Sequence, residues 1–145
     1  MADRVLAGIV LISGDKVLLV LSRKDARAGR WRWSIPKGRY KSGSDVGLFD
    51  AAARELKEEA GIDLAGVGVG MSDCVGRGVL TYSRKGRSVE LHHFVLASPL
   101  IVLDSRVTAG EAMAGVGLFD HGLARTMIAE EQHVLIDMYL PGSFF

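Results

Sequence analysis

The stretch LFDAAARELKEEAGI, residues 48–62, is the most informative part of this 145-residue chain. It is rich in Ala, Leu, Lys and Glu, and neither Gly nor Pro interrupts residues 48–60. These residue types favour helix, so the stretch predicts a helix over Leu48–Ala60. Gly61 is well placed to end it, because glycine readily adopts the left-handed conformation that often follows a helix.

Three carboxylates share one face of this predicted helix. Glu55, Glu58 and Glu59 stand at i, i+3 and i+4,. One interpretation is a solvated face on which Arg54 and Glu58 form a weak i,i+4 ion pair. The other is a metal site, because three neighbouring acids repel one another and Mg²⁺ takes oxygen ligands that it shares with substrate phosphates. The basic loop just before the helix favours a site for phosphate transfer or phosphate hydrolysis.

The rest of the chain predicts a mixed α/β (α+β) domain spanning residues 1–145, with a mixed sheet layered between helices. Before the helix we expect a hairpin of Ala7–Ile12 and Val17–Leu21, then a short strand at Trp31–Ile35 and a loop at 36–38,. After it we expect bent, strand-like structure over Val67–Tyr82, a turn at Ser83–Arg87, a strand at Val89–Ala97, a loop at Glu111–Gly117 and a helix at Leu123–Leu140, closed by Pro141-Gly142.

Composition narrows the class of protein. Lys and Arg total 18 against 17 Asp and Glu, so the net charge is +1 and no global field attracts nucleic acid or a membrane,. Cys74 is the single cysteine, which suits a reducing compartment,. No signal peptide or apolar span long enough to cross a bilayer is evident, so we expect a cytoplasmic protein.

Pro36-Lys37-Gly38 followed by Arg54-Glu55-Leu56-Lys57-Glu58-Glu59-Ala60-Gly61-Ile62 resembles the Nudix box of the Nudix hydrolases. The helical half matches that pattern at every defined position. The first half does not, because the loop after Gly38 is two residues longer and Val46 stands where the family has glutamate. Asp45 is one candidate substitute. Alternatively, Asp45 or Ser44 caps the helix N terminus.

The resemblance implies the Nudix fold and hydrolysis of a diphosphate linkage with Mg²⁺ or Mn²⁺. It implies that Glu55, Glu58, Glu59 and the backbone carbonyl of Gly38 contact the metal, and that Arg54 holds a glutamate in place. A general base must also accept a proton from the attacking water. Family members take it from the box helix or from a later loop, where Glu111 is the first candidate. The alternative is that Glu111 is an ordinary exposed acid.

Basic residues point to an anionic substrate. Residues 23–41 contain eight Lys or Arg in a nearly neutral protein, and a second group lies on the expected hairpin turn,. The candidate substrate-binding residues are Arg30, Arg32, Lys37, Arg39, Lys41, Arg84, Lys85 and Arg87. The pattern is similar to that of Nudix enzymes acting on diphosphoinositol polyphosphates and dinucleoside polyphosphates; ADP-ribose and (d)NTPs are alternatives. Trp31, Trp33, Tyr40 and Tyr82 could stack a base, although packing of the two tryptophans against the sheet is the preferred interpretation.

Other classes of function remain open. A catalytically silent Nudix module could hold a polyphosphate or an RNA cap, and an adaptor could bind through the C-terminal helix and Phe144-Phe145. The intact set of Arg54, Glu55, Glu58 and Glu59 argues for the enzyme. The expected partner is therefore a small phosphorylated molecule and not nucleic acid. Many Nudix enzymes form homodimers, but nothing in the sequence indicates an interface.

Overall fold

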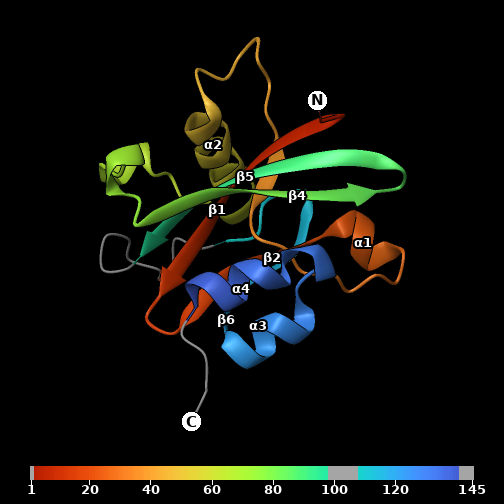
Figure 1. Cartoon of the computed structure of the whole chain (residues 1–145). Helices are drawn as coiled ribbons and strands as arrows, with labels where there is room; N and C mark the ends of the chain where they lie inside the picture. Colours follow the sequence, from red (N-terminus) through yellow and green to blue (C-terminus); the bar gives the residue numbers. More distant parts are fainter. Residues whose placement is uncertain (1, 98–107, 141–145) are drawn as a thin grey trace.

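The computed structural model describes residues 2–97 and 108–140, which form one six-stranded sheet between two layers of helix (Figure 1). The predicted α/β layering is confirmed. The strands are β1 (Arg4–Ser13), β2 (Lys16–Ser22), β3 (Lys37–Arg39), β4 (Gly76–Arg84), β5 (Arg87–Ala97) and β6 (Met113–Asp120). The helices are α1 (Arg23–Arg27), α2 (Leu48–Ala60), α3 (His121–Met127) and α4 (His133–Tyr139), with 3₁₀ turns at Ala65–Val67, Met71–Asp73 and Glu130–Gln132.

Strand β1 is the centre of the sheet, and two strands share its second edge. The strand order is β4-β5-β1-β2-β6, and β3 pairs with β1 outside this path. On one edge β1 runs parallel to β5 from Arg4 to Ile12. On the other edge it pairs with β2 only beside their common turn and then with β3 at Leu6–Gly8, while β2 pairs along its length with β6. The sheet therefore divides between β2 and β3, and we call this division the fork.

Alternation of side chains along β1 and β2 builds two cores. On one face, residues such as Ile9 and Leu11 pack against α2. On the other, Val10 and Leu19 pack with residues of α3 and α4. The predicted hairpin is confirmed, and Gly14 adopts a positive φ of 64° in its turn. Both hairpin strands are buried on both faces because helices cover each side of the sheet,.

Helix α2 has the bounds that the sequence predicts. Ala51, Ala52, Leu56 and Ala60 form its buried stripe, and Gly61 ends it in the left-handed conformation, with φ 74°. Gly47 is its N-cap, and no side chain caps the first turn. Of the two alternatives for this loop, the one in which Ser44 or Asp45 caps the helix was therefore wrong.

Several other elements differ from the prediction. Trp31–Ile35 is not a strand: it makes only isolated bridges, Ser34 with Val20 and Trp33 with Ile128. The predicted loop at 36–38 instead contributes Lys37 and Gly38 to β3, because β2 leaves that edge of β1 unpaired. Most of the loop predicted at Glu111–Gly117 belongs to β6, since pairing with the buried β2 outweighs the poor strand propensity of its glycines,.

The C-terminal and central segments also depart from expectation. The predicted single helix at Leu123–Leu140 is two helices, separated by extended backbone at Ile128 and Ala129 and a 3₁₀ turn. Ala129 donates to the Trp33 carbonyl at 2.8 Å instead of continuing the helix. In the segment Val67–Tyr82, one 3₁₀ turn ends at Val67 and a second spans Met71–Asp73 before β4 begins. Phe144-Phe145 and Pro141-Gly142 lie outside the described residues, and within those residues no helix is long and apolar enough to cross a membrane.

Candidate active site

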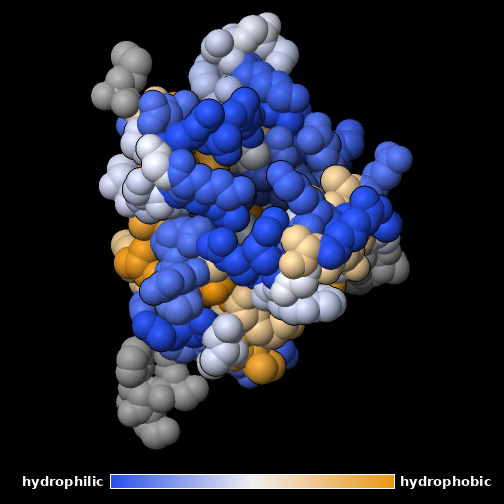
Figure 2. Space-filling view, turned by 90° about the vertical axis from the view of Figure 1, so that its right-hand side faces the viewer, coloured by the Kyte–Doolittle hydropathy of each residue, from blue (hydrophilic) through white to orange (hydrophobic). Residues whose placement is uncertain are grey.

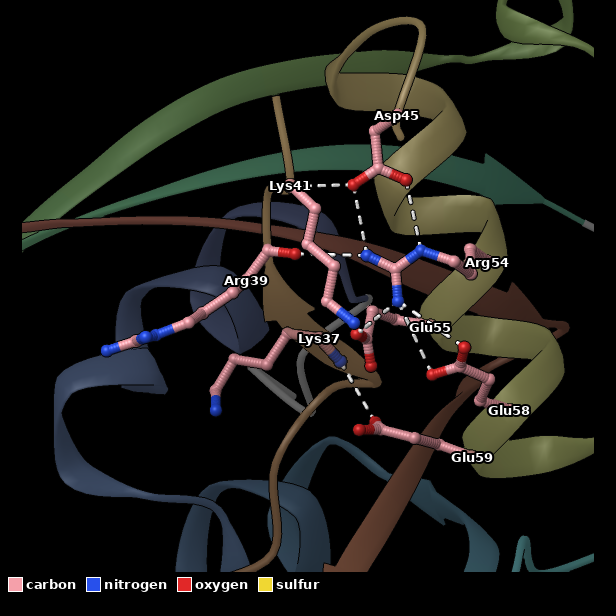
Figure 3. Close-up of polar contacts among 8 residues, drawn as sticks. All are labelled: Lys37, Arg39, Lys41, Asp45, Arg54, Glu55, Glu58 and Glu59. Carbon is pink, nitrogen blue, oxygen red and sulfur yellow. Dashed lines mark hydrogen bonds and ion pairs between the residues drawn. The ribbon is translucent and has the colours of Figure 1, made fainter. Parts of the chain in front are cut away.

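Arg54 is the centre of the polar network on α2 (Figure 3). Its Nε and Nη2 donate to the two carboxylate oxygens of Asp45 at 3.0 and 3.1 Å. Its Nη1 donates to Glu55 at 2.9 Å and contacts the Glu58 carboxylate at 3.4 Å. Arg54 Nη2 also reaches the Arg39 carbonyl of β3 at 3.0 Å. One guanidinium therefore joins the long loop, the helix and β3, and it contacts two glutamates.

Asp45 lies in the long loop before α2, and the sequence left the role of its side chain undecided. Its side chain is only 5% exposed, and its Oδ2 also accepts the Lys41 backbone N–H at 2.7 Å. The Arg54 guanidinium holds the pKa of the Asp45 carboxyl below its usual value. Asp45 therefore supplies the carboxylate for Arg54 from a loop that carries no glutamate.

Gly38 makes room for Glu55. A Cβ at Gly38 would overlap the Glu55 carboxyl group, so no other residue type fits there without displacing it. Glu55 is buried against β3, while Glu58 is 56% exposed on the outer side of Arg54. Glu55 and Glu58, which the sequence places on one helical face, are thus in different environments.

Glu59 lies closest to β3. Its Oε1 accepts the Lys37 backbone N–H at 3.0 Å. Burial, together with the neighbouring Glu55 carboxylate, raises the pKa of Glu59 to about 8,. Burial also lowers the pKa of the Lys37 ammonium, and Glu59 opposes that shift. Glu55 and Glu59 form a crowded acidic pair, which a cation would neutralise.

The donor set of this acidic pair fits a hard divalent cation. Within residues 2–97 and 108–140, no three His, Cys, Asp or Glu side chains are already gathered as a cation site. Mg²⁺ needs fewer protein ligands than three, because one or two carboxylates together with water and substrate phosphate are enough to bind it. Backbone oxygen is also nearby. The Lys37 N–H and the Arg39 carbonyl face α2, so strand alternation directs the Lys37 carbonyl to α2 and the Gly38 carbonyl to β1,.

Three of the predicted substrate-binding residues come together across the fork. Arg32 Nη2 contacts both carboxylate oxygens of Glu131 at 2.9 and 3.2 Å, and Arg84 Nη1 lies 3.5 Å from the same carboxylate. Both arginines and Glu131 influence Tyr82, whose pKa is raised mainly by burial. Lys37 lies in the field of Arg84 and Glu131. We call Arg32, Lys37 and Arg84 the cationic cluster.

A small cavity of about 110 Å³ connects the cationic cluster with α2. It lies at the fork, and Arg32 and Lys37 line it together with Glu59 and Asp25. Figure 2 views the side of the molecule on which α1 and the β4–β5 turn lie, and this surface is mainly hydrophilic. Acidic and basic side chains therefore meet in one cavity.

The other predicted basic residues lie outside the cluster. Arg30 pairs with Asp25 at 3.2 Å. Arg39 and Lys41 are exposed beside the α2 network, and Lys85 and Arg87 are exposed at the β4–β5 turn. The basic window of the sequence is therefore partly neutralised and partly dispersed.

Glu111 and the aromatic residues were harder to place from sequence. Glu111 is exposed, and its position is fixed through backbone: Arg23 Nε donates to its carbonyl at 2.7 Å, and the preceding Gly110 donates to the Glu59 carbonyl at 3.0 Å. Trp33 packs edge-on against Phe119. Trp31 is 67% exposed, so the prediction that both tryptophans pack on the sheet was wrong for Trp31.

The sequence gave no signal for two residues near the site. Glu131 lies 99 residues after Arg32, and Gln132 is fully buried although polar. Gln132 Oε1 accepts the Ile35 N–H at 3.0 Å, and its Nε2 contacts Ser34 Oγ at 3.2 Å. No sequence spacing links Glu131 and Gln132 to the loop of Arg32 and Ile35, because the two segments are about a hundred residues apart.

Comparison with known proteins gives one family. The profile of the NUDIX domain matches residues 2–114. A search of curated proteins finds no match. Among solved structures, the chain is similar to a C. elegans Ap4A hydrolase in a binary complex, with a TM-score of 0.70, 23% identity, and 92% of this chain and 93% of that chain covered.

Two further structures share the fold. One is the E. coli dihydroneopterin triphosphate pyrophosphohydrolase, with a TM-score of 0.68, 19% identity and 96% of each chain covered. The other is a bifunctional NMN adenylyltransferase/ADP ribose pyrophosphatase from Francisella tularensis, with a TM-score of 0.66 and 23% identity, covering 92% of this chain and 39% of that one. The profile spans most of the chain and includes the helix that carries Arg54 and its glutamates, so this protein belongs to the NUDIX domain family.

Proposed function

We propose that this chain is a metal-dependent pyrophosphohydrolase that cleaves a diphosphate linkage in a small phosphorylated molecule. The observation that carries the proposal is the cavity at the fork, which brings Glu59 of α2 next to Lys37 and Arg32. Carboxylates that hold a metal beside cations that hold phosphate are the groups that diphosphate hydrolysis needs.

Glu55 and Glu59 would hold Mg²⁺ or Mn²⁺, with the exposed Glu58 as a further ligand. The direction of the β3 peptide groups supports the Lys37 carbonyl, instead of that of Gly38, as the backbone ligand. When bound, the metal neutralises charge on the diphosphate and lowers the pKa of water. Arg54 keeps Glu55 and Glu58 on one side of the helix without itself contacting substrate.

Glu111 is our candidate for the general base from outside the helix. Its backbone lies beside the C-terminal end of α2, because Gly110 donates to the Glu59 carbonyl. The exposed Glu111 carboxylate is free to approach a water that lies over the metal ligands,. The alternative base on the helix itself is Glu58, which is also exposed.

The charges at the site favour a dinucleoside polyphosphate over a diphosphoinositol polyphosphate. Arg32 and Arg84 share Glu131, and Arg30 pairs with Asp25, so the positive charge available to phosphate is moderate. An inositol ring crowded with phosphates needs more unpaired cations. The exposed indole of Trp31 is adjacent in sequence to Arg32 and could stack on a nucleobase,. Arg39, Lys41 and Arg87 would then make outer phosphate contacts.

Product analysis by mass spectrometry tests the proposal. The protein would be incubated with dinucleoside polyphosphates, ADP-ribose, nucleoside triphosphates and diphosphoinositol phosphates, each with Mg²⁺ and with EDTA. We expect Mg²⁺-dependent cleavage, fastest with a dinucleoside polyphosphate. The Glu59→Gln variant should be nearly inactive, and Glu90→Gln, on β5, should match the parent. Binding without cleavage of any compound would replace the enzyme with a silent polyphosphate-binding module.

A further inference from the structure

Glu131 is an acidic residue in direct contact with two members of the cationic cluster. Its carboxylate contacts Arg32 from the loop before β3 and Arg84 from the end of β4. The Glu131 side chain is 15% exposed, whereas both arginine side chains are 36% exposed. The acid therefore lies behind the two guanidinium groups, and the guanidinium groups face solvent.

Neither arginine is saturated by this contact. A guanidinium carries five N–H donors in a planar fork. In the described part of the chain, the side-chain hydrogen bonds of Arg32 and Arg84 all go to Glu131, each through a single nitrogen. The remaining N–H edges can bind phosphate oxygens while Glu131 stays in place.

Glu131 is also held in position by its neighbour. The buried Gln132 side chain bonds to Ile35 and Ser34, and Ala129 donates to the Trp33 carbonyl at 2.8 Å. The 3₁₀ turn that carries Glu131 is thus fastened on both sides to the loop that carries Arg32. These hydrogen bonds hold the backbone of Glu131 beside the loop that carries Arg32.

We propose that Glu131 is a specificity-determining residue, which offsets part of the positive charge of the cationic cluster and so limits how many phosphates the protein binds well. This inference rests on the proposed function, since it concerns the same polyphosphate site. Glu131 acts through Arg32 and Arg84 and touches no reacting atom.

The charge of Glu131 outweighs its role as a tether for the arginines. An ion pair between partly exposed side chains contributes little to their order. Repulsion between Glu131 and substrate grows with every phosphate charge, because Coulomb energies add. The tether affects all ligands equally, whereas repulsion affects long polyphosphates most. This difference separates the two roles in an experiment.

The test is calorimetric binding of linear inorganic diphosphate, triphosphate and tetraphosphate to the full chain in EDTA at 0.15 M salt. For Glu131→Gln we expect an affinity gain of about threefold for diphosphate and roughly a further twofold for each added phosphate, from screened Coulomb repulsion at several ångströms. Glu131→Asp keeps the charge and should keep the parental trend. Glu90→Gln is the matched control, because Glu90 pairs with His92 at 3.0 Å on the opposite face of the sheet.

Two more variants separate charge from structure. Glu131→Ala removes the same charge without adding an amide and should give the same dependence on phosphate number. Glu131→Gln combined with Arg84→Gln restores the net charge and should return that dependence to the parental one. Four results would each overturn the proposal. Glu131→Gln could bind all three anions more weakly, bind them with unchanged affinity, or gain the same factor in affinity for all three. The fourth result is that the parent binds none of them.

Hydrolysis is measured separately, so the two proposals can fail independently. If binding follows phosphate number but Mg²⁺ supports no cleavage, the enzyme assignment fails and the role of Glu131 stands. If the parent cleaves a substrate but Glu131→Gln leaves all three affinities unchanged, the role of Glu131 fails and the enzyme assignment stands.

Discussion

Replacing Asp45 by alanine removes a carboxylate that accepts three hydrogen bonds: two from Arg54, at 3.0 and 3.1 Å, and one from the Lys41 backbone, at 2.7 Å. Hydrogen bonds to charged groups contribute about 1.5–3 kcal/mol each, and breaking a buried ion pair costs roughly 3–5 kcal/mol. Arg54 keeps Glu55 and Glu58 and is partly exposed, so the loss lies at the low end of that range.

We therefore expect Asp45→Ala to lower the free energy of unfolding by about 3 kcal/mol, or the melting temperature by roughly 9 °C for a chain of this size. Thermal unfolding followed by circular dichroism measures this. Asp50→Ala is the control, because Asp50 is an exposed acid in the first turn of α2 and its loss should cost only about 0.5 kcal/mol,.

The pH dependence of this loss has a definite sign. Arg54 lowers the pKa of Asp45 below 3.8, so its contribution is present above pH 3.8 and disappears as the pH falls through the pKa of the folded state,. Parent and variant should converge in acid. Two results would refute the assignment of Asp45 as the partner of Arg54. One is that Asp45→Ala and Asp50→Ala are equally stable at pH 7. The other is that the difference in stability between the parent and Asp45→Ala grows in acid.

Three further predictions concern the carboxylates beside β3. Glu59→Gln should abolish turnover and should stabilise the metal-free protein near pH 8. The pKa of Glu59 in the folded protein is about 8, above the ordinary 4.5, so the free energy of unfolding of the parent should fall as the pH rises between these two values,. A free energy of unfolding that does not change over this pH range would contradict the prediction. Mg²⁺ binding should release about one proton between pH 5 and 7, and the affinity for Mg²⁺ should increase up to about pH 8,. Calorimetry in buffers of different ionisation enthalpy measures the number of protons released. If no proton is released, Glu59 is not a ligand. Gly38→Ala should weaken Mg²⁺ binding at least tenfold by displacing Glu55, whereas Gly43→Ala, where a Cβ meets nothing within 4 Å, should not,.

Local patterns predicted the elements whose conformation depends on nearby sequence. Helix α2 and the β1–β2 hairpin follow from an uninterrupted run of helix formers and from a Gly-Asp turn between apolar strands. The loop of Gly38–Gly47 was uncertain, because Asp45 could replace the missing glutamate of the box or cap the helix. In the folded loop, which turns back on Lys41, Asp45 pairs with Arg54 and does not cap α2.

Pairings between distant segments were not predictable in this way. Strand β3 exists because β2 leaves one edge of β1 open, and β6 forms although its sequence contains two glycines. The break after α3 depends on Trp33, almost a hundred residues earlier. The neutralisation of Arg32 and Arg84 by Glu131 is of the same kind, which explains why the sequence overstated the free positive charge.

The fork in the sheet also gives the site a direction. Glu55 and Glu59 lie on the α2 face, whereas the Lys37 side chain leaves β3 on the opposite face, beside Gly8. In the proposed function, a phosphate chain that contacts both the α2 carboxylates and Lys37 would extend from one face of the sheet to the other at the fork, where Lys37 and Glu59 line one cavity. A monophosphate ester would then contact only one of these two groups. The fork would in this way favour substrates with several linked phosphates.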